Sequence, residues 1–194
     1  MRLVLSTRNE HKLREFAQLL APHDVDPLPA SVMLPPETGE TFEENALEKA
    51  RAAAAQTGRV AIADDSGIAA EALGGRPGVR SARFAGEHAT DEENLAKLLR
   101  EAPAGSNLAY VCALAYVDPH APVEHLVEGR CTGVLAAEPR GSGGFGYDPA
   151  FIPSDRDDGR TMAELSVDEK DAISHRGRAA RAFLEWLERE TQAA

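Results

Sequence analysis

The sequence has few of the features that would place it in several common protein classes. It contains 2 cysteines, Cys112 and Cys131, and both lie in apolar segments without the spacing of zinc ligands. Two such thiols build no disulfide framework, so we expect them to be buried and unreactive. No apolar run approaches the roughly 20 residues that span a bilayer, and residues 1–6 lack the apolar core of a signal peptide. We therefore expect a reduced, cytoplasmic protein without membrane contact.

Positive charge is also scarce. The chain has 21 Lys and Arg against 32 Asp and Glu, a formal net charge of −11. The nucleic-acid backbone repels such a protein, so we expect no nucleic-acid partner. A small anionic ligand remains compatible with this charge, because a local basic pocket or a bound cation reverses the field nearby. The length of 194 residues is typical of a single domain, here predicted to span residues 1–194 without a linker.

Short β-prone segments alternate with amphipathic ones along the chain. Three pairs match the capping box of a helix start: Thr41 with Glu44, Thr90 with Glu93, and Ser166 with Glu169. The patterns predict strands at 2–6, 25–28, 60–63, 108–117 and 123–134, and helices at about 9–21, 41–58, from 90, from 166, and at 174–190. This order predicts an α/β fold with a mixed sheet.

The acidic run Asp64-Asp65-Ser66-Gly67 directly follows the apolar segment 60–63. We expect its two carboxylates to end a buried strand, where α/β sheets bind ligands. Adjacent carboxylates beside an apolar strand are costly unless a cation neutralises them, and hard oxygen ligands suit Mg²⁺. Taken alone, the run is somewhat more typical of a solvated acidic turn than of a metal site.

A second acidic segment, residues 37–45, carries four carboxylates. Acidic side chains in a first helical turn also favour the helix dipole, so most of them need no ligand to explain them. Glu37 lies outside the predicted helix, where this explanation fades. It is therefore the better metal candidate of the four.

Cationic residues stand at two predicted helix starts. Residues 7–12 (Thr-Arg-Asn-Glu-His-Lys) follow the first strand and open a helix, where backbone N–H groups bind anions or are satisfied by ordinary capping. His175, Arg176 and Arg178 open the last helix, where positive charge opposes the helix dipole. An anionic ligand would remove this conflict, whereas a solvated basic face is the alternative.

The loop 143–149 alternates glycine with aromatic residues. Glycines permit close backbone approach, and Phe145 and Tyr147 offer ring faces on which a nucleobase stacks. The alternative is a loop that the two rings anchor to the core. A cation site, two phosphate-binding positions and an aromatic platform together indicate a nucleoside polyphosphate bound with Mg²⁺.

The sequence resembles the inosine triphosphate pyrophosphatase family, which acts on non-canonical purine nucleotides. The resemblance rests on residues 6–12, 37–39 with 42–46, 62–67, 73–78 with 81–84, 143–149 and 170–177, in order along nearly the whole chain. It implies two lobes around a central mixed sheet with a substrate cleft between them, and usually a homodimer. It also implies hydrolysis of dITP, ITP and XTP to the monophosphate and pyrophosphate.

The resemblance also implies roles for individual residues. Asp65 would accept the proton of the attacking water and bind Mg²⁺, with Glu37 as a second ligand. The substrate-binding residues would be Thr7, Arg8, Asn9, Glu10, His11, Lys12, Ser66, Phe145, Gly146, Tyr147, Asp148, Lys170, His175 and Arg176. Asp64 is left with a supporting role.

Arg8 departs from the family pattern, which often has glycine at this position. An arginine would be strained if the position required a positive φ, whereas an ordinary backbone would let Arg8 add a cation near the phosphates. Two other functions stay open: a Maf-like pyrophosphatase acting on modified or pyrimidine nucleotides, and a non-catalytic nucleotide sensor. An acidic protein-interaction domain is a third, less specific interpretation.

Overall fold

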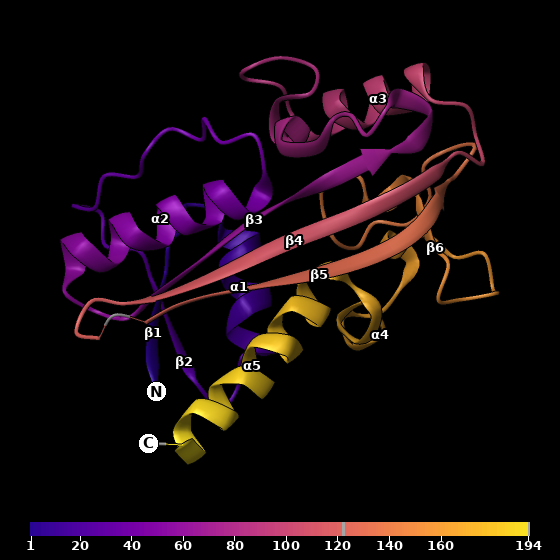
Figure 1. Ribbon diagram of the computed structural model, residues 1–194. Coiled ribbons are helices and arrows are strands. Elements are labelled where there is room, and N and C mark those ends of the chain that lie inside the picture. Colours follow the sequence, from indigo (N-terminus) through magenta and orange to yellow (C-terminus); the bar gives the residue numbers. More distant parts are fainter. Residues whose placement is uncertain (122, 194) are drawn as a thin grey trace. The chain divides into compact units, whose positions relative to one another are not determined.

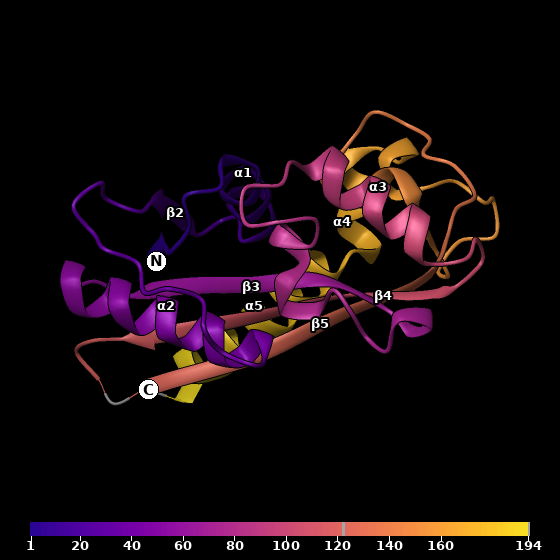
Figure 2. The same ribbon diagram turned by 90° about the horizontal axis from the view of Figure 1, so that it is seen from above.

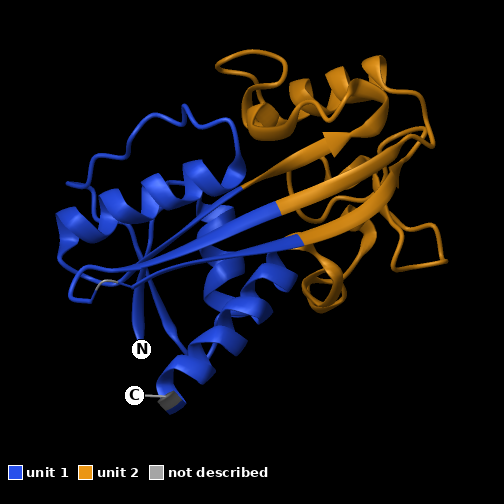
Figure 3. Cartoon of the chain, in the orientation of Figure 1, with its two compact units in different colours: residues 1–65, 112–129, 176–194 blue, residues 66–111, 130–175 orange. Residues whose placement is uncertain are grey.

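The protein, described here from a computed structural model over residues 1–121 and 123–193, divides into two compact units (Figure 3). Unit 1 contains residues 1–65, 112–129 and 176–194, and unit 2 contains residues 66–111 and 130–175. The chain therefore passes between the units four times, at residues 65–66, 111–112, 129–130 and 175–176.

Unit 1 has helices on both faces of a sheet. Strand β1 (Arg2–Leu5) pairs in parallel with β2 (Asp24–Pro27) and with the start of β3 (Ala61–Ala70). One apolar cluster joins β1, β3 and β4 (Asn107–Asp118) to the alanine-rich helix α2 (Phe42–Thr57). A second joins the same strands to α1 (Glu10–Leu19) and α5 (His175–Ala193). Figure 1 shows α2 and α5 on opposite sides of these strands.

Unit 2 is built on a single apolar cluster. Unit 2 contains α3 (Asp91–Glu101), the short strand β6 (Phe151–Pro153), the short helix α4 (Val167–Ile173) and several 3₁₀ turns. Figure 2 shows α3 and α4. Leu95 and Leu98 of α3 pack with Tyr147, Phe151 and Met162 in its core. The glycine-rich loop that ends at Pro149 is thereby attached to the core through Tyr147.

Three strands belong to both units: β3, β4 (Asn107–Asp118) and β5 (Val123–Leu135). The strands are hydrogen-bonded in the order β2-β1-β3-β4-β5-β6, with β5 and β6 antiparallel. Parallel and antiparallel pairs occur together, so the predicted α/β fold with a mixed sheet is confirmed. The single-domain organisation and the substrate cleft stay predictions.

The sequence predicted that the acidic run 64–67 ends its strand, but in the structure the strand continues beyond the run. Strand β3 continues from Ala61 to Ala70, so Asp64 and Asp65 lie in its middle. Turn-forming residue types are overridden here because Ile68 and Ala70, beyond the run, are fully buried. Gly67 fits the strand since a Cβ at this position would overlap Ser81 Oγ and Gly78 O. The predicted strand end at residue 63 was therefore wrong.

The helix starts follow the predicted capping residues. Thr41, Thr90 and Ser166 each form a complete capping box with Glu44, Glu93 and Glu169. Gly58 ends α2 in the left-handed conformation with φ 62°. These short-range hydrogen bonds involve neighbours in sequence, which explains why the sequence located them.

The only tryptophan of the sequence, Trp186, lies on α5 in unit 1. Its ring stacks on His125 of β5, with centroids 4.1 Å apart and planes at 10°. Tyr116 and Phe183 surround it at centroid distances of 5.0 and 5.7 Å. Burial is the largest influence on His125 and lowers its pKa, which favours the neutral ring in this stack.

Both cysteines are fully buried, as predicted. Burial raises the pKa of the Cys112 thiol, which keeps it protonated. Across the described residues, no helix combines the length and apolar character needed to cross a bilayer.

Candidate active site

Asp64 is a fully buried carboxylate that two cations hold. Lys12 Nζ lies 2.9 Å from Asp64 Oδ2, and Arg176 Nε lies 3.6 Å from the same oxygen. Burial alone would raise the pKa of this carboxyl, but Lys12 and Arg176, with Lys49 further away, lower it well below its ordinary value. Asp64 is therefore firmly ionised, and it fixes two cations from distant parts of the sequence.

Asp65, the next residue, has a different environment. Its Oδ1 lies 3.2 Å from Lys49 Nζ and its Oδ2 accepts a hydrogen bond from Asn45 Nδ2 at 3.0 Å. Burial raises the pKa of Asp65, and the Glu37 carboxylate adds to this, whereas Lys49 lowers it; the net direction is upward. Adjacent strand residues point to opposite faces, so the two aspartates meet different partners. Of the two, Asp65 is the carboxylate that accepts a proton more readily.

Glu37 joins this cluster through a lysine. Lys49 Nζ lies 2.7 Å from Glu37 Oε1, so one buried ammonium bridges Glu37 and Asp65. Burial acts to lower the pKa of Lys49, but Asp65, Asp64 and Glu37 raise it overall. The side chain of Glu37 is 33% exposed, whereas that of Asp65 is 8% exposed, so Glu37 is the more accessible of the two carboxylates.

The donor set at this point suits a hard cation that also binds substrate. Within the described residues, no group of three or more His, Cys, Asp or Glu side chains is arranged to hold a metal. Mg²⁺ commonly takes only one or two carboxylates and completes its shell with water and phosphate oxygens. Glu37 and Asp65 supply two carboxylates around one positive charge, which fits that pattern. Magnesium binding by these residues stays a prediction.

The segment 7–12 is capped by its own side chains. Asn9 Oδ1 accepts hydrogen bonds from the amides of His11 and Lys12 at 2.8 and 3.2 Å, and Thr7 Oγ1 accepts from the Asn9 amide at 3.1 Å. The capping interpretation of this helix start is thus confirmed. Among described non-glycine residues no φ is positive, so Arg8 has an ordinary backbone. The triphosphate contacts of residues 7–12 stay predictions.

Asp148 is the buried carboxylate of the candidate site in unit 2. Its Oδ1 accepts from Tyr110 Oη at 3.1 Å, and its Oδ2 accepts from Lys170 Nζ at 2.9 Å and from the Phe145 amide at 3.0 Å. A Cβ on Gly144 would overlap Asp148 Oδ2, so the loop approaches the carboxylate only because that residue is glycine. Lys170 Nζ also lies 5.3 Å from the centroid of the Phe145 ring.

The two aromatic residues of the glycine-rich loop differ in exposure. Tyr147 is buried, and its hydroxyl donates to Ser81 O at 2.7 Å. Burial raises the pKa of this phenol, so it stays neutral. Phe145 is half-buried, which leaves part of its ring accessible. Gly146 donates its amide to Asp91 Oδ2 at 3.0 Å. Of the two rings, only that of Phe145 has accessible surface for stacking on a base.

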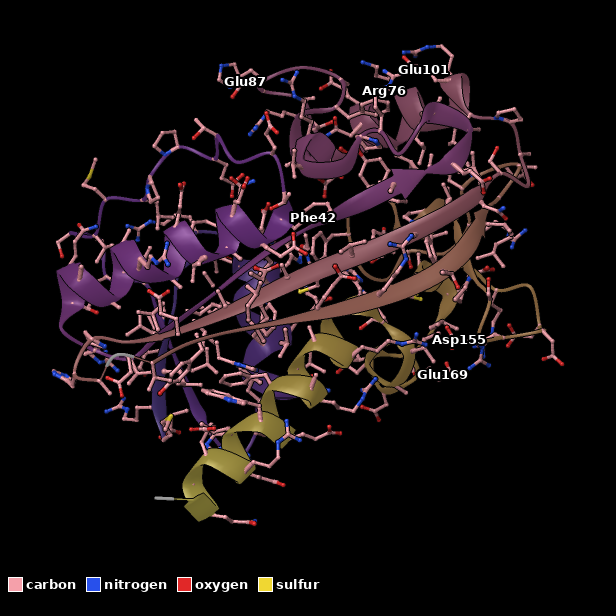
Figure 4. All side chains as sticks on the ribbon, viewed as in Figure 1. Phe42, Arg76, Glu87, Glu101, Asp155 and Glu169 are labelled. Carbon is pink, nitrogen blue, oxygen red and sulfur yellow. The ribbon has the colours of Figure 1, made fainter. Side chains whose placement is uncertain are left out.

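His175 and Lys170 are held by the residues around them. The His175 ring stacks on Tyr110, with centroids 4.5 Å apart and planes at 7°. Lys170 lies on α4, whose capping residue Glu169 also accepts hydrogen bonds from Arg160 at 3.2 and 2.6 Å (Figure 4). Ser66, half-buried on β3, follows Asp65 directly. The contacts of these residues with substrate stay predictions.

Four residues that organise the cluster of unit 1 and the Asp148 site of unit 2 were not predicted from the sequence. Asn45 and Lys49 contact Asp65, Glu15 Oε2 lies 3.1 Å from Arg176 Nη1, and Tyr110 contacts Asp148 and His175. Asn45 and Lys49 stand four residues apart on the buried alanine face of α2. Polar residues at helical spacing within an apolar stripe indicate buried side chains that need polar partners, so the sequence did contain a signal for this pair. Glu15 and Tyr110 carried no such signal.

Residues 3–186 of the chain match the Ham1 family. The chain belongs to the Ham1 family. The predicted resemblance is thereby confirmed. Among Ham1 relatives, the dITP/XTP pyrophosphatase of Geobacillus kaustophilus is 49% identical over 186 residues, covering 91% of this chain and 89% of the relative. The dITP/XTP pyrophosphatase of Shigella flexneri is 48% identical, covering 96% and 98%.

Solved structures agree with this assignment. The structure of a HAM1 protein from Coxiella burnetii superposes with a TM-score of 0.86 at 41% identity, and covers 97% of this chain and 99% of that one. Such coverage means that the chain corresponds to these relatives over nearly their whole lengths.

Proposed function

We propose that this protein hydrolyses non-canonical purine nucleoside triphosphates (dITP, XTP and ITP) to the nucleoside monophosphate and pyrophosphate. The observation that carries the proposal is the buried pair Asp64 and Asp65, whose pKa values are shifted in opposite directions. Buried carboxylates with perturbed pKa values beside cations are typical of catalytic sites. The printed name of the relatives, dITP/XTP pyrophosphatase, supports the same reaction on dITP and XTP.

Asp65 is the proposed general base. Because burial and Glu37 raise its pKa, its carboxylate takes a proton from water more readily than an exposed aspartate does. Asn45 and Lys49 each contact one of its oxygens, which fixes the orientation of the group. The water attacks the α-phosphorus, Asp65 accepts its proton directly or through a second water, and pyrophosphate leaves with the former bridging oxygen.

The cations of unit 1 bind the triphosphate in this proposal. Asp64 holds Lys12 and Arg176, and Glu15 contacts Arg176 as well, so these side chains are positioned before substrate arrives. Preorganised positive charge stabilises the negative charge of phosphoryl transfer without rearrangement. Bound Mg²⁺, held by Asp65 and Glu37, would supply further charge neutralisation at the phosphate oxygens.

The base and ribose are assigned to residues 145–148, Lys170 and His175. Hypoxanthine and xanthine carry a 6-keto acceptor where adenine has an amine, and His175 is the proposed donor to it. A donor left without an acceptor costs about 1–3 kcal/mol, so such a site discriminates against adenine. Guanine shares the keto group, so its 2-amino group must be excluded by a different contact.

A pyrophosphate-release assay over all purine triphosphates, with and without Mg²⁺, tests the function. We expect magnesium-dependent release from dITP, ITP and XTP, and far less from the adenine and guanine nucleotides. Equal efficiency on ITP and GTP would contradict the assignment. Preference for a pyrimidine or modified nucleotide would favour the Maf-like alternative, and tight binding without release would favour a nucleotide sensor.

The homodimer that the resemblance implies is a second part of the proposal. Size-exclusion chromatography with light scattering measures it, and the mass expected is twice the 20.8 kDa of the chain. A monomer at micromolar concentration would contradict this part and leave the catalytic proposal intact.

A further inference from the structure

Arg8, in the loop between β1 and α1, contacts a distant segment of unit 1 instead of its own helix. Its Nη1 donates to Leu28 O at 3.0 Å, and its Nη2 donates to Pro29 O at 3.1 Å and to Val32 O at 2.8 Å. A longer contact of 3.4 Å reaches Ala30 O. One guanidinium thus binds carbonyl groups along the segment 28–32.

This segment depends on side chains for its backbone hydrogen bonds. Residues 28–40 contain no helix or strand, and Val32 N to Pro29 O, at 3.1 Å, is a single turn within it. At its other end, Gln56 of α2 accepts from the Met33 amide at 2.9 Å and donates to Met33 O at 2.8 Å. Carbonyl groups without regular partners need donors, and Arg8 supplies them.

The clamped segment leads directly to Glu37. Leu28 and Val32 are buried against α2 and the sheet, and Pro35 and Pro36 then precede Glu37. Two consecutive prolines restrict the backbone, so the position of residues 28–33 is transmitted to the next few residues. A side chain that fixes residues 28–32 therefore also restricts where the Glu37 carboxylate lies.

We infer that Arg8 is a positioning residue that clamps the segment 28–33 and so orients Glu37 toward Asp65, and that it is not a phosphate ligand. The two terminal nitrogens of its guanidinium already bind neutral carbonyls, whereas Lys12, in the first turn of α1, lies beside Asp64. The inference deepens the proposed function. Its activity measurements rest on that function, whereas its hydrogen-exchange measurements do not.

The first test measures amide hydrogen exchange over residues 28–39 in Arg8→Ala, Arg8→Lys and wild-type protein. We expect the amide hydrogens of residues 28–39 to exchange roughly tenfold faster or more in both variants. Alanine removes the donors, and the ammonium of lysine cannot bind several carbonyl groups as the planar guanidinium does. Alanine is preferred to glycine, which would itself loosen the loop. Arg14→Ala is the matched control, since Arg14 contacts only Glu10 O and His11 in the described hydrogen bonds. Unchanged exchange in Arg8→Ala would overturn the clamp.

The second test separates metal from nucleotide binding. In both Arg8 variants we expect the Mg²⁺ concentration for half-maximal activity to rise several-fold, with KM for nucleotide at saturating Mg²⁺ changed by less than about twofold. A phosphate ligand predicts the reverse: KM rises in Arg8→Ala and Arg8→Lys restores it. That result would overturn the inference. If wild-type protein released no pyrophosphate, the proposed function would fail, and hydrogen exchange would still decide the clamp.

A third variant, Gln56→Ala, releases the other end of the same segment. If Arg8 acts through the segment, Gln56→Ala should also accelerate exchange over residues 28–39. The effects of Arg8→Ala and Gln56→Ala should then be non-additive in the double variant. Full additivity, with no effect of either change on the Mg²⁺ requirement, would contradict a shared mechanical role.

Discussion

Each unit contains a buried aspartate that contacts a lysine, yet the two settings differ. In unit 1, Lys49 lies beside two carboxylates, Asp65 and Glu37, which compete for one ammonium. In unit 2, Asp148 alone accepts from Lys170, Tyr110 and the Phe145 amide. A crowded set of carboxylates leaves one of them ready to take a proton, whereas a single, fully hydrogen-bonded carboxylate is suited to holding a loop.

The largest effect is expected from Asp65→Asn. The substitution keeps the shape of the side chain but removes the proton acceptor, so turnover should fall about 10²–10⁴-fold. Because the pKa of Asp65 is raised by folding, its ionised form costs stability above its unfolded pKa. The variant should therefore melt no lower than wild type at pH 7. Turnover and thermal melting measure the two effects, and near-wild-type turnover would remove Asp65 from its role.

In contrast to Asp65→Asn, the substitution Asp64→Asn should mainly lower the stability of the protein. It leaves Lys12 and Arg176 without their buried carboxylate, and breaking a buried ion pair costs about 3–5 kcal/mol of unfolding free energy. Asp64 has a folded pKa below its ordinary value, so its stabilisation is present above the unfolded pKa and is lost as pH falls through the folded pKa.

Urea unfolding of wild type and Asp64→Asn between pH 7 and pH 3 measures this effect. The difference in unfolding free energy should stay constant down to about pH 4, near the ordinary value for aspartate, and narrow below it. A difference that grows on acidification would refute the ion-pair explanation.

Gly144 and Gly146 provide a matched pair in unit 2. Both have a left-handed backbone, with φ of 68° and 65°, but only a Cβ on Gly144 would overlap Asp148, while nothing lies within 4 Å of one on Gly146. Gly146→Ala should cost about 1–2 kcal/mol for its backbone alone, and Gly144→Ala clearly more. Urea unfolding compares them; equal losses would show that the loop adapts around Asp148 without cost.

The smallest effect is expected from Tyr110→Phe. It removes the hydrogen bond to Asp148 but keeps the ring that stacks on His175, so the cost should be about 0.5–1.5 kcal/mol. Urea unfolding measures the loss. KM for nucleotide should rise modestly and kcat should change little, because the phenol does not contact the proposed base Asp65. A fall in kcat as large as that of Asp65→Asn would contradict the division between the two settings.

The sequence predicted the features that depend on near neighbours. The capping boxes, the adjacency of β4 and β5 in the sheet and the burial of the cysteines followed from residue types at short spacing. The position of the acidic run within β3 was not predicted from the sequence. The run contains turn-forming residue types, but the buried residues on both sides of it keep the chain in the strand. The asymmetry between Asp64 and Asp65 was expected, but its cause, separate cations at residues 12, 176 and 49, required long-range contacts.

The location of Trp186 has a practical consequence for folding experiments. Because Trp186 belongs to unit 1, whereas Tyr110 and Tyr147 belong to unit 2, intrinsic fluorescence excited at the indole band reports the first unit selectively. Far-ultraviolet circular dichroism reports both. Coincident transitions by the two signals would indicate one cooperative domain, and separate midpoints would reveal an intermediate in which only one unit is folded.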